Sequence, residues 1–325
     1  MSVLTTILLA MLALLLVLGA SLAWFTGRIA RRIEQGMPPT GRFVDVPGAR
    51  LHVVERGQGP AILLVHGLSG QLGNFAYGMI EPLARDFRVI AVDRPGSGYS
   101  TRQPGTGADL PTQAAALAAL IDRLGLERPL VVGHSLGGAI ALALALGHPE
   151  RVGGLALLAP LTHPPEGVPA VFKALATERP WLRRLIAWTL AVPMSIARRE
   201  QVMSIVFGPD PVPEDFATRG GGLLALRPSH FIAASEDLVA AGRSLPPQVP
   251  AYAGLRLPLS ILYGREDRIL DPAHNGEALA AKVPGARLVL VPGGHMLPIT
   301  AVDTSVRFVR EAATQLHRPE AVAVG

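Results

Sequence analysis

"VVGHSLGGAIALALALG", residues 131–147, is the stretch that decides the fold. A β-branched run leads into a serine bracketed by glycines, and an alanine- and leucine-rich helical run follows. A G-x-S-x-G pattern between a strand and a helix is typical of a sharp turn that strains the serine backbone and raises its hydroxyl above the sheet edge. Gly133 and Gly137 are expected there because larger side chains would clash. Ser135 is therefore the candidate nucleophile, although a glycine-rich turn with an incidental serine is the alternative interpretation.

Outward from this turn, short apolar strands alternate with helices. Strands buried on both faces and alternating with helices indicate an α/β fold with a mostly parallel, doubly wound sheet. A hairpin is expected first, at 42–46 and 50–55. The later strands are expected at 61–65, 88–92, 130–132, 155–159, 257–263 and 287–291. The helices are expected at 75–84, 110–124, 136–146, 272–281 and 304–316.

The alternation breaks between the strand at 155–159 and the strand at 257–263. Residues 161–226 are proline-rich and helical in character, with no clear strand, which predicts a helical cap over the carboxyl edge of the sheet. The α/β core is then expected to comprise residues 41–160 and 227–317, and residues 318–325 a frayed tail.

The first 27 residues differ from the rest of the chain. No side chain from Ser2 to Gly27 is ionisable, and a helix of this length spans the roughly 30 Å apolar core of a bilayer. Trp24 and Phe25 stand where interfacial aromatics are common, and arginines follow directly. The sequence therefore predicts a single-pass membrane anchor at 1–27, joined to the domain by a linker at 28–40.

Two points about this segment stay open. A cleaved signal peptide is the alternative to an anchor, with Ser21-Leu22-Ala23 as a small-x-small cleavage site. The arginines after the apolar run favour a cytoplasmic domain by the positive-inside rule, whereas signal cleavage would leave a periplasmic or secreted protein.

Composition excludes several classes of function. Among 325 residues, 49% are hydrophobic and 17% charged, so a large core can form, and the absence of cysteine excludes disulfides, thiolate catalysis and cysteine-based metal sites. The net charge of +5 does not indicate nucleic-acid binding, because the basic residues are scattered and only Lys173 and Lys282 are lysines.

A serine nucleophile needs a base, and the base needs an orienting carboxylate. His295 follows the last expected strand in "VPGGHM", and Asp267 ends "LYGRED" directly after another strand. Loops at the carboxyl ends of parallel strands are where active sites gather, and the chain order serine, acid, histidine is the one this fold uses. Asp267 and His295 are therefore the candidate acid and base, with Glu266 and Asp271 as competing acids.

The other histidines have less suitable surroundings. The His134 side chain, next to the nucleophile, is expected to point away from it. His52, His148, His163, His230, His274 and His317 also lie in less suitable contexts.

An oxyanion hole needs two preorganised N–H donors. The amide of Leu136, directly after the nucleophile, is the first candidate. The loop "HGLSG" after the strand at 61–65 supplies the second, from the amide of Leu68. The alternative is that the glycines of this loop only shape a tight turn and that the loop supplies no oxyanion donor.

Together these motifs resemble those of the α/β-hydrolase-fold family with a helical cap. The resemblance covers residues 41–316 and rests on five motifs: His66-Gly67, the segment from Asp93 to Ser100, the elbow at Ser135, Gly264 to Asp267, and Gly294-His295. It implies that the Asp93 segment is a structural turn beside the site, in which Asp93 ties its own loop. It implies neither a metal nor an organic cofactor.

The nucleophile narrows the expected activity. Epoxide hydrolases and haloalkane dehalogenases of this fold use an aspartate at the elbow, so Ser135 argues against both. Carboxylesterases and lipases, carbon–carbon bond hydrolases, cofactor-free haloperoxidases and acyltransferases remain. The first hypothesis is a serine hydrolase that cleaves an apolar carboxylic ester through an acyl-enzyme. The alternatives are a carbon–carbon bond hydrolase and a non-catalytic binding protein.

Overall fold

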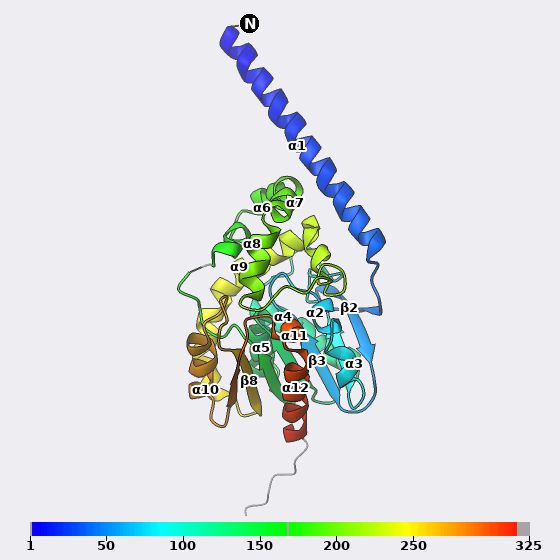
Figure 1. Ribbon diagram of the computed structural model, residues 1–325, viewed down its shortest axis with the longest axis vertical. Coiled ribbons are helices and arrows are strands. Elements are labelled where there is room, and N and C mark those ends of the chain that lie inside the picture. The colour runs from blue at the N-terminus through cyan, green and yellow to red at the C-terminus, as the bar shows by residue number, and fades with distance from the viewer. Residues whose placement is uncertain (1, 168, 317–325) are drawn as a thin grey trace, which may run out of the picture.

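A nine-stranded sheet forms the centre of the domain within residues 2–167 and 169–316, which the computed structural model describes (Figure 1). Its order is β1-β2-β4-β3-β6-β7-β8-β9, with β5 paired to β2. The pairs β1–β2, β2–β4 and β2–β5 are antiparallel, and every pair from β4 to β9 is parallel. The strands are β1 (Arg42–Val46), β2 (Ala49–Arg56), β3 (Ala61–Val65), β4 (Arg88–Val92), β5 (Thr101–Arg102), β6 (Leu130–His134), β7 (Gly154–Leu158), β8 (Leu259–Gly264) and β9 (Arg287–Val291). The expected mostly parallel sheet is confirmed.

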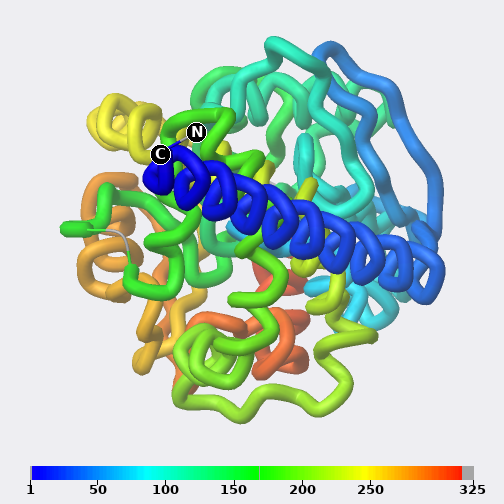
Figure 2. The backbone as a smooth tube through the Cα atoms, turned by 90° about the horizontal axis from the view of Figure 1, so that it is seen from above, coloured from blue at the N-terminus to red at the C-terminus, as the bar shows by residue number. Residues whose placement is uncertain are grey.

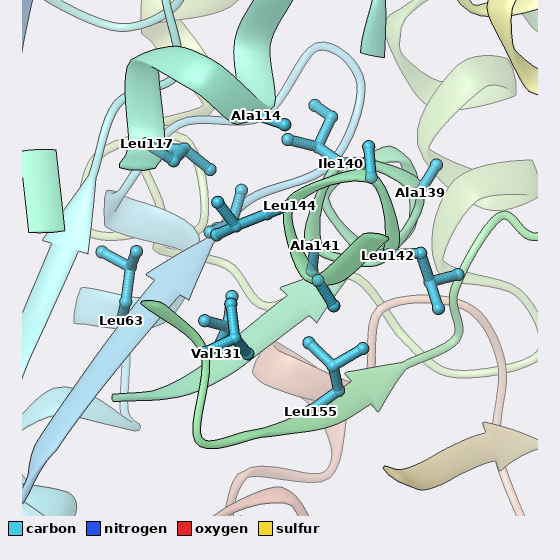
Figure 3. Close-up of a cluster of buried hydrophobic side chains, with 14 of the residues drawn as sticks. Leu63, Ala114, Leu117, Val131, Ala139, Ile140, Ala141, Leu142, Leu144 and Leu155 are labelled. Carbon is cyan, nitrogen blue, oxygen red and sulfur yellow. The ribbon is translucent and has the colours of Figure 1, made fainter. Parts of the chain in front are cut away.

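Helices cover both faces of this sheet. Along β3, Leu63 belongs to one buried cluster and its neighbours Ile62 and Leu64 to the other, so successive side chains fill two separate cores. On the first face lie α4 (Leu110–Arg123), α5 (Leu136–Gly147) and α10 (Ala278–Lys282). On the second lie α2 (Gly73–Ala76), α3 (Ile80–Leu83) and α12 (Val302–Leu316). Figure 3 shows Leu63 and Val131 of the sheet beneath Leu144 of α5, in the first core.

Helices between β7 and β8 lie within residues 161–226, for which the sequence predicts a cap, and we call this segment the cap. They are η2 (Ala170–Leu175), α6 (Pro180–Thr189), α7 (Ala191–Ala197), α8 (Arg199–Phe207) and η3 (Gly222–Leu226). The long helix α9 (Pro228–Gln248) follows, in a stretch where the sequence predicted no particular element. It begins with a proline at its first turn, and Pro246 and Pro247 lie inside its last turns. Pro246 and Pro247 interrupt only the last turns of α9, and the helix packs against α6, η2 and α4.

Shorter elements complete the fold. The helix expected at 75–84 is divided into α2 and α3, and the one at 272–281 is formed by η5 and α10. The remaining elements are η1 (Pro149–Arg151), η4 (Val249–Gly254), η5 (Ala273–Glu277) and α11 (Leu297–Thr300). The tail expected at 318–325 lies outside the described residues.

The N-terminal helix α1 (Val3–Gly36) projects from the domain as one continuous helix (Figures 1 and 2). Its most apolar 18-residue window has a mean hydropathy of 2.7, and none of that window is buried. The linker expected at 28–40 is therefore wrong for residues 28–36, which continue the helix. Ile33 is buried against the domain and stabilises this last part, and the chain leaves the helix only where Pro38 and Pro39 follow.

Candidate active site

Ser135 occupies a strained turn between β6 and α5. Its φ of 54° and ψ of −121° lie in a region that side chains other than glycine rarely adopt. A Cβ atom at Gly133 would lie 2.6 Å from the Gly137 carbonyl oxygen, and one at Gly137 would collide with the Val65 carbonyl oxygen. Both glycines are therefore required by close backbone approach, which is the reason that the sequence suggested for them.

Asp267 and His295 meet although 28 positions separate them. His295 Nδ1 lies 2.7 Å from Asp267 Oδ2, and both side chains are buried. The other carboxylate oxygen of Asp267 accepts the backbone N–H groups of Ile269 and Leu270, at 2.8 and 3.0 Å. Both oxygens thus have partners, which fixes the carboxylate and through it the orientation of the imidazole.

The two competing acids have other partners. The Gly293 amide donates to Glu266 Oε2 at 2.7 Å, and the His274 amide donates to Asp271 Oδ1 at 2.6 Å. Glu266 thus stabilises the loop that precedes His295. Asp271 caps the helical turn that follows Asp271 itself. Of the three carboxylates weighed in the sequence, Asp267 is the one that reaches the imidazole.

Ser135 and His295 line one cavity of about 530 Å³. No hydrogen bond joins the serine hydroxyl to the imidazole in the part of the chain that the structure describes. Contacts of this kind in unliganded sites often tighten only in the complex with substrate. Ser135 and His295 thus face one cavity, and Asp267 is connected to it only through its bond to the His295 ring.

The two candidate oxyanion donors lie beside Ser135. Leu136 is the first residue of α5, so its amide has no partner within the helix. Gly67 approaches so closely that a Cβ there would stand 2.8 Å from the Ser135 Cβ, and Leu68 follows it in the loop. Leu68 and Leu136 both line the cavity, and within the described residues no protein acceptor is bonded to either amide. Both N–H groups are available to an oxygen bound next to Ser135.

Arg94 is a site residue that the sequence did not single out. Its side chain is completely buried and donates to the carbonyl oxygens of His66 and Gly67, each at 2.9 Å. It also donates to Gln113 Oε1 at 2.7 Å and to Asp237 Oδ2 at 2.6 Å. The guanidinium thereby ties the loop that carries Leu68 to α4 and α9. The only signal in the sequence was its place directly after Asp93.

Asp93 itself is structural, as the resemblance implied. Its Oδ1 accepts the Leu72 amide and its Oδ2 the Tyr99 amide, each at 2.8 Å, and His52 Nδ1 lies 2.8 Å from Oδ2. The carboxylate holds two loops together beneath the site.

The His134 side chain, which the sequence predicted to point away from the nucleophile, lines the cavity and contacts His295. Its ring packs against the His295 ring, with centroids 5.0 Å apart, and its Nε2 lies 3.0 Å from the His295 carbonyl oxygen. Burial, together with the neighbouring His295, lowers the pKa of His134 to about 3, so the ring is neutral and donates Nε2–H to that carbonyl. The residue beside the candidate nucleophile thus anchors the loop of the candidate base.

His230 of α9 also lines the cavity, although the sequence placed it among the histidines with less suitable surroundings. Burial, reinforced by Arg227, lowers the pKa of His230 to about 4. The imidazole therefore adds a neutral group to the cavity wall.

Most of the cavity wall is apolar. Cap side chains contribute much of this apolar wall, among them Phe172, Ile196, Val202, Met203, Phe207 and Phe216. No group of three or more His, Asp or Glu side chains within the described ranges could hold a metal ion.

With this geometry in place, comparison with known proteins is informative. Residues 60–302 match the model of the alpha/beta hydrolase fold family. The chain belongs to the α/β-hydrolase-fold family. It is 30% identical to haloalkane dehalogenase 2 of Mycobacterium tuberculosis over 273 residues, which cover 82% of this chain and 92% of that protein.

Two further relatives extend the range of activities among the similar proteins. The chain is 31% identical over 260 residues to a 2-hydroxy-6-oxononadienedioate/2-hydroxy-6-oxononatrienedioate hydrolase of Paraburkholderia phymatum, covering 76% of this chain and 86% of that one. The crystal structure of a membrane phospholipase A, described as a bacterial virulence factor, superimposes with a TM-score of 0.64 at 22% identity. That match covers 97% of this chain and 100% of the other. Membership in the hydrolase family is therefore shown, and the bond that this member cleaves is a separate question.

Proposed function

We propose that this protein is a membrane-anchored serine hydrolase that cleaves a carboxylic ester of an apolar substrate. One observation carries the proposal: His295, held by Asp267 at 2.7 Å, lines the same cavity as Ser135 on its strained turn. A hydroxyl, an imidazole and a carboxylate in this relation form the apparatus of acyl transfer.

The mechanism follows from these positions. His295 takes the proton of the Ser135 hydroxyl as its oxygen attacks the ester carbonyl, and Asp267 stabilises the imidazolium that forms. The amides of Leu68 and Leu136 receive the oxyanion, each lowering the barrier by on the order of 3 kcal/mol. His295 then protonates the departing alcohol. Water activated by the same imidazole attacks the acyl-enzyme, releases the acid and restores Ser135.

Two features support an apolar, lipid-like ester. The cavity wall contributed by the cap is apolar, which suits an acyl chain. The match to the membrane phospholipase A leaves about 3% of 325 residues, or roughly 10, unmatched, which is fewer than the 34 residues of α1. Because that protein is named a membrane phospholipase, the extent of the match supports α1 as a membrane anchor.

Hydrolysis of a carbon–carbon bond is the second candidate. The 31% identity to the Paraburkholderia phymatum hydrolase favours it, since the name of that enzyme specifies a dienedioate or trienedioate. Dehalogenation is disfavoured in spite of the similar dehalogenase, because Ser135 stands where those enzymes use an aspartate.

A fluorophosphonate probe tests the proposal on the full-length protein in detergent. We expect labelling that disappears in Ser135→Ala and persists in Ser195→Ala, a second serine in the cavity wall. Equal labelling in both variants, or none in the unaltered protein, would favour a binding protein. Turnover of p-nitrophenyl esters compared with that of a vinylogous diketone then separates an esterase from a carbon–carbon bond hydrolase.

Whether α1 is retained as an anchor, and on which side of the membrane the domain lies, is tested separately. We expect the mature protein to begin before residue 21, with the domain on the cytoplasmic side. N-terminal sequencing and protease access in intact cells measure both properties, and a mature terminus after Ala23 would identify α1 as a signal peptide.

A further inference from the structure

Helix α6 of the cap has its apolar face turned outward. Trp181, Leu185 and Trp188 follow one another at the spacing of a single helix face, and their exposed fractions are 61%, 53% and 46%. On the opposite face Arg183 is buried, and its Nε donates to Ser235 Oγ at 2.9 Å. A helix that buries an arginine and exposes two tryptophans is oriented opposite to the usual arrangement for a surface helix in water.

The outward apolar surface continues onto α7. Leu190, Met194 and Ile196 have exposed fractions of 52%, 43% and 46%. We call the outward side chains of both helices the cap face, which comprises Trp181, Leu185, Trp188, Leu190, Met194 and Ile196. Large apolar side chains gathered on one surface mark an interaction site, because water disfavours their exposure.

The cap face lies next to α1. The two helices α1 and α6 are in contact, and a Cβ atom at Gly27 would stand 3.6 Å from the Trp188 ring. Figures 1 and 2 show the N-terminal part of α1 rising past α6 and α7 and away from the domain. About 20 residues of helix cross the apolar core of a bilayer, so a span that starts near Leu4 ends close to Trp24. The cap face therefore contacts α1 where this helix would leave the bilayer.

Positive charge surrounds this surface. The Arg28 guanidinium lies over the Trp24 ring, 5.5 Å from its centroid. Glu34 and Glu200 are the acidic residues of α1 and of the segment from α6 to the first turn of α8. The exposed arginines of these elements outnumber them and are Arg28, Arg31, Arg32, Arg184, Arg198 and Arg199. Apolar side chains bordered by arginines suit the boundary between acyl chains and anionic headgroups.

We propose that the cap face is a second membrane contact, which docks on a phospholipid bilayer with anionic headgroups beside the point where α1 leaves it. The cavity extends to this surface, since Ser195, Ile196 and Arg199 contribute to its wall. Docking would thus place the cavity beside the lipid. The proposal rests on α1 as a bilayer span, which belongs to the proposed function, but it does not depend on ester chemistry.

The distribution of tryptophan allows a direct test. The chain has three tryptophans, and they are Trp24, Trp181 and Trp188. The double variants Trp24→Phe/Trp181→Phe and Trp24→Phe/Trp188→Phe each leave one reporter on the cap face. Full-length protein is reconstituted in phosphatidylcholine–phosphatidylglycerol vesicles with or without bromine on the acyl carbons nearest the headgroup.

We expect brominated lipid to quench at least about half of the fluorescence of each reporter, and acrylamide in the water to quench it weakly. Strong acrylamide quenching without bromolipid quenching would overturn the proposal, because the face would then lie in water. Protection from both quenchers would also overturn it and would favour a second copy of the chain on this face.

Activity provides an independent measurement. Trp181→Ser/Leu185→Ser changes side chains that do not line the cavity, and we expect unchanged turnover of a soluble short-chain ester but at least a tenfold loss on an ester embedded in vesicles. Equal turnover of the embedded ester would contradict docking. If the unaltered protein hydrolyses neither ester, the proposed function fails, while the quenching measurement still decides whether the cap face contacts lipid.

Discussion

At the residue scale, the adjacent carboxylates Glu266 and Asp267 have different hydrogen-bond partners and different expected roles. Asp267 bonds the imidazole of His295, whereas Glu266 bonds a backbone amide of the same loop. We expect Asp267→Asn to lower kcat for a p-nitrophenyl ester by on the order of 10⁴, because the amide favours the wrong tautomer of the imidazole. The matched control Glu266→Gln keeps an acceptor for the Gly293 amide, so its kcat should fall by less than about tenfold. Similar losses in the two variants would remove Asp267 from its proposed role.

Gly67 offers a second test at this scale. A methyl group there would stand 2.8 Å from the Ser135 Cβ and 3.3 Å from His134 Nδ1, so the loop must shift to accommodate it. We expect Gly67→Ala to reduce kcat by about 10², because the Leu68 amide would leave the position that an oxyanion requires. At Gly147, where a Cβ would meet nothing within 4 Å, the same substitution should leave kcat unchanged. A fully active Gly67→Ala enzyme would contradict the assignment of the oxyanion loop.

At the scale of elements, a buried ion pair connects the site to α9. Asp237 lies 2.6 Å from Arg94 and 2.6 Å from Arg102, and its side chain is completely buried. Removing one partner of such a pair leaves an uncompensated charge in the core. These contacts make α9 part of the support of the oxyanion loop as well as part of the cavity wall.

We therefore expect Asp237→Ala to lower the free energy of unfolding by about 3–5 kcal/mol. The control is Asp122→Ala, which breaks a pair with Arg151 whose side chains are 56% and 33% exposed, and it should cost less than about 1 kcal/mol. Denaturant unfolding of the full-length protein in micelles measures both. Equal losses would mean that the Arg94 charge finds another partner.

At the scale of the whole molecule, buried neutral histidines make stability depend on pH. Burial lowers the pKa of His134 to about 3 and of His230 to about 4, and it lowers the pKa of His66 well below its ordinary value. An unfolded histidine titrates near pH 6.5, so below that pH the unfolded chain binds protons that the folded chain does not. The stability that these neutral buried histidines contribute is fully present above about pH 6.5 and is lost as the pH falls toward 4. His52, whose pKa is raised by Asp93 against the effect of burial, opposes this trend.

We expect the free energy of unfolding to fall between pH 7 and pH 5, with each neutral buried histidine contributing up to about 1.4 kcal/mol per pH unit. His134→Gln keeps a donor for the His295 carbonyl but cannot titrate, so the slope should become shallower. His274→Gln, at an exposed position, is the control. An unchanged slope in His134→Gln would show that His134 gains a proton while folded.

The sequence by itself determined the features that depend on short range. The strand–turn–helix at Ser135, the positions of Asp267 and His295 after their strands, the parallel sheet and the apolar α1 all follow from local periodicity and from glycines at a tight turn. Such patterns can be recognised in the sequence because each depends only on residues that are close together along the chain.

Only the tertiary structure decided which distant groups meet. Arg94 and Asp237 are 143 positions apart, and the His134 ring reaches a carbonyl 161 positions away. The helical state of residues 28–36, the existence of α9 and the outward apolar face of α6 likewise depend on packing partners. The physical reason is that burial and charge pairing are properties of a neighbourhood in space, which local patterns of residue type do not specify.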